Sequence, residues 1–180
     1  MRILVSFSFG KITSIINIAK LKSFRDSQDD YDLILIMSWE ELRREDFDFW
    51  VSLESRWRDM DSLGHINHAA YLTYMESARV KVYFDLGYEG IRKEERESTI
   101  LGSMEVYYHQ QAAHPLKLEI GHRVSRVGVK SFDFISGIFQ KDDNNPICTA
   151  LFKMVAFNYS DNQAIPVPKK IKELCRPISL

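Results

Sequence analysis

The sequence predicts an α+β fold, in which one long central helix is wrapped by a curved antiparallel sheet of five to six strands. From Tyr71 to Leu86, apolar residues recur every three or four positions with no internal glycine or proline, which indicates a helix. Four segments with strand-like patterns follow it. The helix is apolar on more than one side and must be covered nearly all round. A single sheet can do that only by curling around it.

Length and composition describe one soluble domain. The chain has 180 residues, a net charge of −1 and 45% hydrophobic residues, and a single domain of this size buries roughly 70% of its unfolded surface. There is no basic field for nucleic acid and no polybasic patch for a membrane, so we expect neither as a partner. Two cysteines, Cys148 and Cys175, cannot make a disulfide framework, which favours a reducing, cytoplasmic location.

The N-terminal 36 residues differ from the rest of the chain. Residues 1–18 are apolar but interrupted by Lys11 and several hydroxyl residues, and are too short for a membrane span. We therefore expect residues 1–36 to be an extension outside the core and residues 37–180 to form the domain. Met37 is a second candidate for the natural start.

Each further element has its own local signal. A charged stretch around Trp39 and Leu42 predicts a short helix over 38–46. Alternation of Val51, Leu53, Ser55 and Trp57 with polar residues predicts a half-buried strand. The central helix begins at Asn67 and stops at Gly87, before a charged loop over 92–97. The remaining predicted elements are strands over 100–109, 116–125, 132–140 and 149–159, a hairpin over 142–146 and a terminal helix over 169–175.

The last two predicted strands carry apolar residues on both faces. One face can meet the central helix, and the other then needs a partner or a second helix. This pattern predicts a homodimer or homotetramer, with each site lined by two subunits.

The turn between the first strand and the central helix concentrates chemistry. It holds Asp59, Asp61, Gly64, His65 and Asn67 within nine residues. Glycine allows a positive φ, and asparagine is a good helix N-cap. The first amide groups of the helix lie unsatisfied beside the positive end of the helix dipole. The turn therefore places a carboxylate next to a site for a developing oxyanion.

The run from Asp59 to Tyr71, followed by Tyr74-Met-Glu-Ser-Ala-Arg79, resembles the signature of the 4-hydroxybenzoyl-CoA thioesterase-like group of hotdog-fold acyl thioesterases. The resemblance extends from about Phe47 to Leu174. It implies an acyl-CoA thioesterase that needs no cofactor and pairs its sheets edge to edge in homo-oligomers. It also implies that Asp61 is the catalytic carboxylate and that the backbone amide of His68 binds the thioester carbonyl. His65 and Asn67 are more like the acyl-carrier-protein thioesterases, so the carrier stays open.

Several roles remain open at this stage. Asp61 would act as a general base on water or as a nucleophile that forms a mixed anhydride. His65 and Asn67 would orient water, Asp61 or the acyl group. The other candidate residues, all for substrate binding, are Gly64, Tyr71, Glu76, Lys130 and Ser131.

Each candidate also has a simpler interpretation. Asp61 can be a loop cap, Asp59 can satisfy turn amides, and Glu76 with Arg79 can be a helix surface pair. Lys130 can be a solvated lysine in a strand-to-strand turn. His65 and His68 have no third His or Cys at a ligand spacing, so we expect no metal.

Other functions are less well supported. The chain has no Gly-x-Ser-x-Gly elbow and no Gly-rich phosphate loop, which argues against an α/β-hydrolase and a nucleotide enzyme. A non-catalytic module that binds acyl-CoA is a further alternative, and the presence of Asp61 argues against it.

Overall fold

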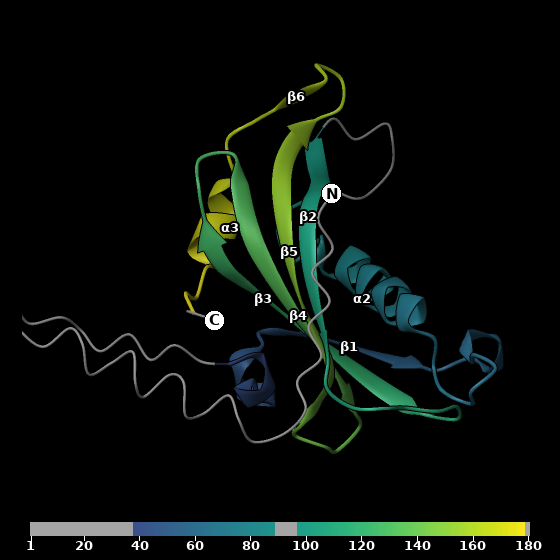
Figure 1. Cartoon of the computed structure of the whole chain (residues 1–180). Coiled ribbons are helices and arrows are strands. Elements are labelled where there is room, and N and C mark those ends of the chain that lie inside the picture. The colour runs from purple at the N-terminus through teal and green to yellow at the C-terminus, as the bar shows by residue number, and fades with distance from the viewer. Residues whose placement is uncertain (1–37, 89–96, 179–180) are drawn as a thin grey trace, which may run out of the picture.

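The computed structural model describes residues 38–88 and 97–178, and confirms the predicted fold class (Figure 1). One main helix, α2 (His68–Val82), lies against a curved antiparallel sheet of six strands, which is the hotdog fold. The strand order is β1-β3-β4-β5-β2, and the short β6 pairs with β5. The strands are β1 (Phe49–Glu54), β2 (Glu97–Tyr108), β3 (Lys117–Val127), β4 (Ser131–Gln140), β5 (Pro146–Asn158) and β6 (Gln163–Ala164).

Helix α2 begins where the sequence predicts. The Oδ1 atom of Asn67 accepts a hydrogen bond from the amide of Ala69 at 2.9 Å, so Asn67 caps the helix. Regular helix ends at Val82, and the chain continues in turns as far as Gly87, whose φ of +89° needs glycine. The buried apolar residues of the helix are Ala70, Tyr71, Tyr74, Met75, Ala78 and Val82.

The sheet is apolar on both faces, as predicted. Phe134 of β4 and Phe152 of β5 belong to the core cluster that α2 covers, whereas Ile135 and Phe139 of β4 form a second cluster on the opposite face. The prediction that a partner or a second helix covers that face is wrong for this cluster. Residues 38–48 of the same chain cover it, because Leu42 and Phe47 pack directly on it. Figure 1 shows this dark blue segment and α2 on opposite sides of the sheet.

Several predicted elements have different bounds, and three of them differ for a clear local reason or in form. The first strand ends at Glu54, and Trp57 begins a 3-10 turn, η3 (Trp57–Asp59), with its side chain 77% exposed. The strand stops because the hydroxyl of Ser55 accepts from the amide of Leu116 at 2.8 Å, and the chain then turns sharply around the Arg56–Asp59 ion pair.

The segment 38–46 forms two 3-10 turns instead of one helix, η1 (Trp39–Glu41) and η2 (Arg44–Asp46), because Leu42 is extended, with ψ of 133°. The terminal helix, α3 (Lys169–Glu173), is two residues shorter than predicted. The predictions for 1–36 and for most of the 92–97 loop lie outside the described residues.

Candidate active site

The turn between β1 and α2 is a closed loop held at both ends. Met60 and Ile66 form an antiparallel bridge, and the amide of Asp61 donates to the carbonyl of His65 at 2.7 Å. The amide of Ile66 donates to the carbonyl of Ala112 at 2.8 Å, which fixes the loop to the segment between β2 and β3. Loop residues held in this way by rigid elements suit a catalytic role.

Asp61 organises the tip of this loop. Its Oδ1 atom accepts hydrogen bonds from the amides of Leu63 at 2.8 Å and His65 at 3.1 Å. The bond from the His65 amide holds the pKa of Asp61 below its usual range, and the Leu63 amide adds to the effect. No hydrogen bond to Oδ2 is found within the described part of the chain. Gly64, with φ of +82°, supplies the positive φ that the tip of the loop requires.

The start of α2 lies directly after this loop. The side-chain oxygen of Asn67 accepts a hydrogen bond from the amide of Ala69, and its backbone carbonyl accepts one from the amide of Ala70 at 2.9 Å. The amide of His68 has no acceptor among the described residues. It therefore remains available to an external oxygen at the positive end of the helix dipole.

Two tyrosines pack behind the helix start. The hydroxyl of Tyr108, at the end of β2, donates to the carbonyl of His68 at 3.1 Å. Its ring meets the buried ring of Tyr71 edge to face, with centroids 5.8 Å apart. Burial raises the pKa of Tyr71 to about 12, so its hydroxyl stays protonated. The sequence did not identify Tyr108, because strand alternation does not reveal which element the end of a strand will reach.

Asp59 has a different environment from Asp61. Its carboxylate accepts from Nε of Arg56 at 2.7 Å and from the hydroxyl of Tyr74 at 2.6 Å. Partial burial raises the pKa of Asp59, but these two hydrogen bonds outweigh burial and hold it below the usual range. Side chains, and not the turn amides that the sequence suggested, satisfy the carboxylate of Asp59.

The structure brings together most of the predicted site residues, but not all. Asp61, Gly64, His65, Asn67, His68 and Tyr71 all lie in the loop or the first turn of α2. Glu76 lies two turns further along the helix and is 69% exposed, with Oε1 3.8 Å from Nη2 of Arg79. Lys130 and Ser131 lie at the turn between β3 and β4.

That turn is remote from the loop within one chain. The loop adjoins the start of β3, through Ser55 and Leu116, whereas Lys130 follows the end of the strand. The eleven residues of β3 span roughly 33 Å. Lys130 and Ser131 therefore lie far from the Asp61 of their own chain.

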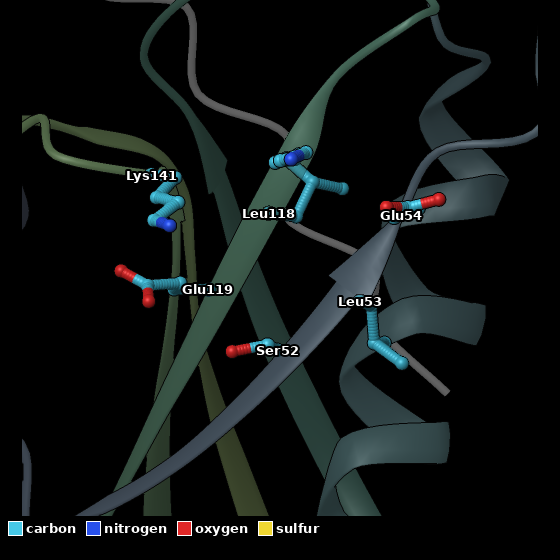
Figure 2. Close-up of a pocket in the computed structure, with 7 residues that line it drawn as sticks. Ser52, Leu53, Glu54, Leu118, Glu119 and Lys141 are labelled. Atoms are coloured by element: carbon cyan, nitrogen blue, oxygen red, sulfur yellow. The ribbon is translucent and has the colours of Figure 1, made fainter.

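A surface depression of about 470 Å³ lies where the end of β1 pairs with the start of β3 (Figure 2). Its walls carry charges of both signs, from Glu54, Lys117, Glu119 and Lys141. It contains none of the loop residues, so it does not form part of the candidate site.

Across residues 38–88 and 97–178, no three His, Cys, Asp or Glu residues are grouped to hold a metal. No helix in those ranges is both long and apolar enough to cross a membrane.

The chain resembles known proteins in sequence and in fold. A sequence model of a family described as the thioesterase-like superfamily matches residues 55–174, more than half of the chain. No curated protein matches it significantly.

Solved structures with the same architecture include three with high coverage. The PA5185 protein from Pseudomonas aeruginosa is 19% identical, with a TM-score of 0.67 over 77% of this chain and 99% of that one. A thioesterase from Thermus thermophilus, complexed with coenzyme A and zinc, is 25% identical, with a TM-score of 0.61 over 72% and 92%. A DHNA-CoA thioesterase from Staphylococcus aureus is 21% identical, with a TM-score of 0.57 over 66% and 79%.

Proposed function

Because the chain belongs to the thioesterase-like superfamily, we propose that it hydrolyses acyl-CoA thioesters and that Asp61 carries out the chemistry. One observation supports this role above the others. Asp61 is held through one carboxylate oxygen by the amides of Leu63 and His65, and its other oxygen remains without a partner in the described chain. A carboxylate fixed through one oxygen presents the other in a defined orientation, which is what an attack on a thioester carbonyl requires.

The proposed mechanism uses Asp61 as a nucleophile. The amide hydrogen bonds lower the pKa of Asp61, so its carboxylate is ionised, which both a nucleophile and a general base require. In this mechanism Oδ2 bonds to the carbonyl carbon, the carbon–sulfur bond breaks, and the thiolate leaves and takes a proton. Water then cleaves the mixed anhydride, which releases the free acid and restores Asp61.

The amide of His68 would stabilise the oxyanion formed in this step. It is the first amide of α2, and the Asn67 cap leaves it without an acceptor among the described residues. Backbone donors aimed at developing negative charge are a major source of stabilisation in acyl transfer. Tyr108 supports this geometry, since its hydroxyl holds the carbonyl of the same residue.

Coenzyme A is the proposed carrier. The Thermus thermophilus thioesterase of the same fold is a complex with coenzyme A, which supports this choice. The resemblance of His65 and Asn67 to acyl-carrier-protein thioesterases favours the alternative. Both residues already have structural tasks, however: Asn67 caps α2, and the backbone of His65 closes the loop onto Asp61. Thiol release from the same acyl group on the two carriers distinguishes these alternatives.

A homodimer is the proposed working assembly. Strand β2 is the last in the described sheet, and its twelve residues present an unpaired edge with exposed Ile100 and Leu101. A long apolar edge strand is a template for pairing with another chain. In a dimer, Lys130 and Ser131 of one subunit could reach the candidate site of the other.

The test of the catalytic assignment compares Asp61→Asn with Asp59→Asn. The amide oxygen of asparagine can still accept from the Leu63 and His65 amides, so the loop should persist and acyl-CoA should still bind. We expect Asp61→Asn to lose most turnover and Asp59→Asn to lose mainly thermal stability, because its pair with Arg56 is weakened. Thiol release near the wild-type rate from Asp61→Asn would rule out the assignment.

Rapid-quench mass spectrometry of the wild type should find an acyl group on the peptide that contains Asp61. Its absence during the steady state would support the general-base mechanism.

A further inference from the structure

Helix α2 and strand β2 run in opposite directions beside each other and are joined at both ends. The hydroxyl of Tyr108 donates to the carbonyl of His68 at one end, and the hydroxyls of Tyr83 and Thr99 lie 2.7 Å apart at the other. Between these contacts, both elements carry apolar residues that pack against the core but are only partly buried, namely Leu72, Met104 and Val106. These three residues, called the apolar strip from here on, begin beside the proposed oxyanion site at the start of α2.

A buried arginine lies at the far end of the apolar strip. Arg79 follows His68 by eleven residues, which is about three turns of helix, so both residues lie on the same face of α2. The guanidinium carbon of Arg79 lies 4.9 Å from the ring centre of Phe152, which is paired in register with Met104 of the strip. Arg79 is only 7% exposed, so its charge lies inside the protein.

The guanidinium of Arg79 is not satisfied by the described part of the chain. Its Nε and Nη1 atoms are buried and have no hydrogen-bond partner there. The carboxylate of Glu76 lies 3.8 Å from Nη2, which is too far for a hydrogen bond, and the Glu76 side chain is 69% exposed. A buried charge is costly unless it is paired. A water molecule could accept the hydrogen bonds but would leave the charge unopposed, so the arginine fits an anionic group better.

A second unpartnered polar atom lies in the same layer. His122 is fully buried, and its Nε2 atom has no partner among the described residues. The ring of His122 stacks on Phe134, which is paired in register with Phe152 beneath Arg79. The space between α2 and the sheet therefore contains two polar groups, from different elements, that can both contact one bound carboxylate.

The position of Arg79 along the helix sets the length of the group that can reach it. Eleven residues of helix rise roughly 16 Å, and a long side chain leans back toward the helix start by about one turn, roughly 5 Å. The guanidinium therefore lies roughly 11 Å along the axis from His68, a length that an extended chain of about eight carbons spans.

We propose that Arg79 determines the acyl specificity by pairing with a carboxylate at the far end of the acyl group, so that the preferred substrates are CoA thioesters of dicarboxylic acids with about eight carbons. The methylene groups of such a substrate would lie on the apolar strip. This inference rests on the proposed function, because the oxyanion site at His68 fixes the near end of the acyl group.

The test compares two thioesters that differ only at the far end of the acyl group, octanedioyl-CoA and octanoyl-CoA. The wild type should show the higher kcat/KM for octanedioyl-CoA, by about tenfold to a hundredfold, because a charge-assisted hydrogen bond forms only with that substrate. In Arg79→Met, an unbranched apolar side chain replaces the guanidinium, and this preference should be lost. Lys81→Met removes an exposed cation from the same helix and is the matched control, which should keep the wild-type preference.

Binding measurements separate the role of Arg79 from the hydrolase assignment. The thioethers S-(ω-carboxyheptyl)-CoA and S-octyl-CoA cannot be hydrolysed, and calorimetry measures their Kd. The wild type should bind the carboxylated thioether more tightly by about tenfold or more, and Arg79→Met should not. If that holds but neither thioester is cleaved, Arg79 binds the carboxylate and the hydrolase assignment is wrong. If both thioesters are cleaved and Arg79→Met keeps the wild-type ratio, hydrolysis stands and the role of Arg79 is wrong.

The wild type alone provides a further test if Arg79→Met does not fold. We expect the variant to fold, because it removes a buried charge that lacks a close counter-charge, and thermal unfolding checks this. Among hexanedioyl-CoA, octanedioyl-CoA and dodecanedioyl-CoA, the wild type should show the highest kcat/KM for octanedioyl-CoA. Equal values, or a steady rise with chain length, would overturn the proposal, because apolar contact alone produces such a rise.

Discussion

At the scale of single residues, two aspartates in one turn show how contacts divide roles that the sequence leaves equivalent. Asp59 and Asp61 have the same side chain and lie two positions apart. The carboxylate of Asp59 is engaged by Arg56 and Tyr74. Among the residues that the structure describes, that of Asp61 accepts only from backbone amides and on one oxygen. The family resemblance singled out Asp61, but only the packing of Tyr74 against the loop explains why Asp59 is unsuited to the same task.

A buried histidine should make the fold sensitive to acid. His122 of β3 is fully buried, and burial together with the nearby charge of Arg79 lowers its pKa to about 3. Below its ordinary pKa of 6.5 the unfolded chain takes up a proton that the folded chain does not. Stability should therefore be complete above about pH 6.5 and fall as the pH drops toward about 3.

The contribution of His122 can be isolated by substitution. His122→Gln removes the titration and retains a group able to hydrogen-bond to Ser136, which lies 2.6 Å from Nδ1 in the wild type. Between about pH 7.5 and about pH 5, the wild type should lose on the order of 2 kcal/mol more than the variant. Urea unfolding of both proteins at the two pH values measures the difference. Equal losses would show that the proton uptake of His122 does not govern acid stability.

At the scale of elements, the sequence predicted most of what periodicity can reveal. The central helix, the hairpin and the five main strands all lie where alternation or helical spacing indicated. The first strand was predicted too long because Trp57 continues the alternation in sequence, while the Arg56–Asp59 pair turns the chain in space. Contacts between distant positions left no local signal. Tyr108 reaches His68 across forty positions, and Phe47 fills a slot formed only when β3 and β4 pair.

The start of α2 allows a test that separates a backbone group from a side chain. His68→Ala keeps the amide N–H, whereas His68→Pro removes it at the first helical position, where proline costs the helix least. Loss of one oxyanion donor typically reduces the rate by about a hundredfold to a thousandfold. We expect the alanine variant to stay within about tenfold of the wild type and the proline variant to lose far more at similar thermal stability.

The two remaining outcomes have clear meanings. If the alanine variant is as inactive as the proline variant, the imidazole of His68 itself carries the chemistry. If both retain high activity, the thioester carbonyl does not lie at the start of α2, and the proposed oxyanion site is wrong.

At the scale of the whole molecule, the two faces and two edges of the sheet have different tasks. The inner face of the sheet packs against α2. On the outer face, residues 38–48 and Ile178 of the same chain cover the apolar cluster around Ile135 and Phe139. Strand β1 is six residues long and carries Trp50, Ser52 and Glu54 on its exposed side, and a short edge strand of this kind suits a free edge. Strand β2 is twice as long and exposes apolar side chains. The apolar outer face, from which an oligomer was first predicted, is thus covered by the chain itself, and the edge of β2 is the stronger reason to expect a dimer.

The edge of β2 can be tested by placing one charge on it. Leu101 is 40% exposed beside the break in register between β2 and β5. Leu101→Lys should oppose pairing of two β2 edges, because it places a charge on an apolar edge strand. We expect light scattering to show half the wild-type mass, and thiol release to fall with it, since each site would lose the residues supplied by its partner. Ser52→Lys, which places the same charge on the opposite edge strand, should leave both mass and activity unchanged. A Leu101→Lys protein that keeps the wild-type mass would show that the assembly uses another surface, and a fully active monomer would show that each chain carries a complete site.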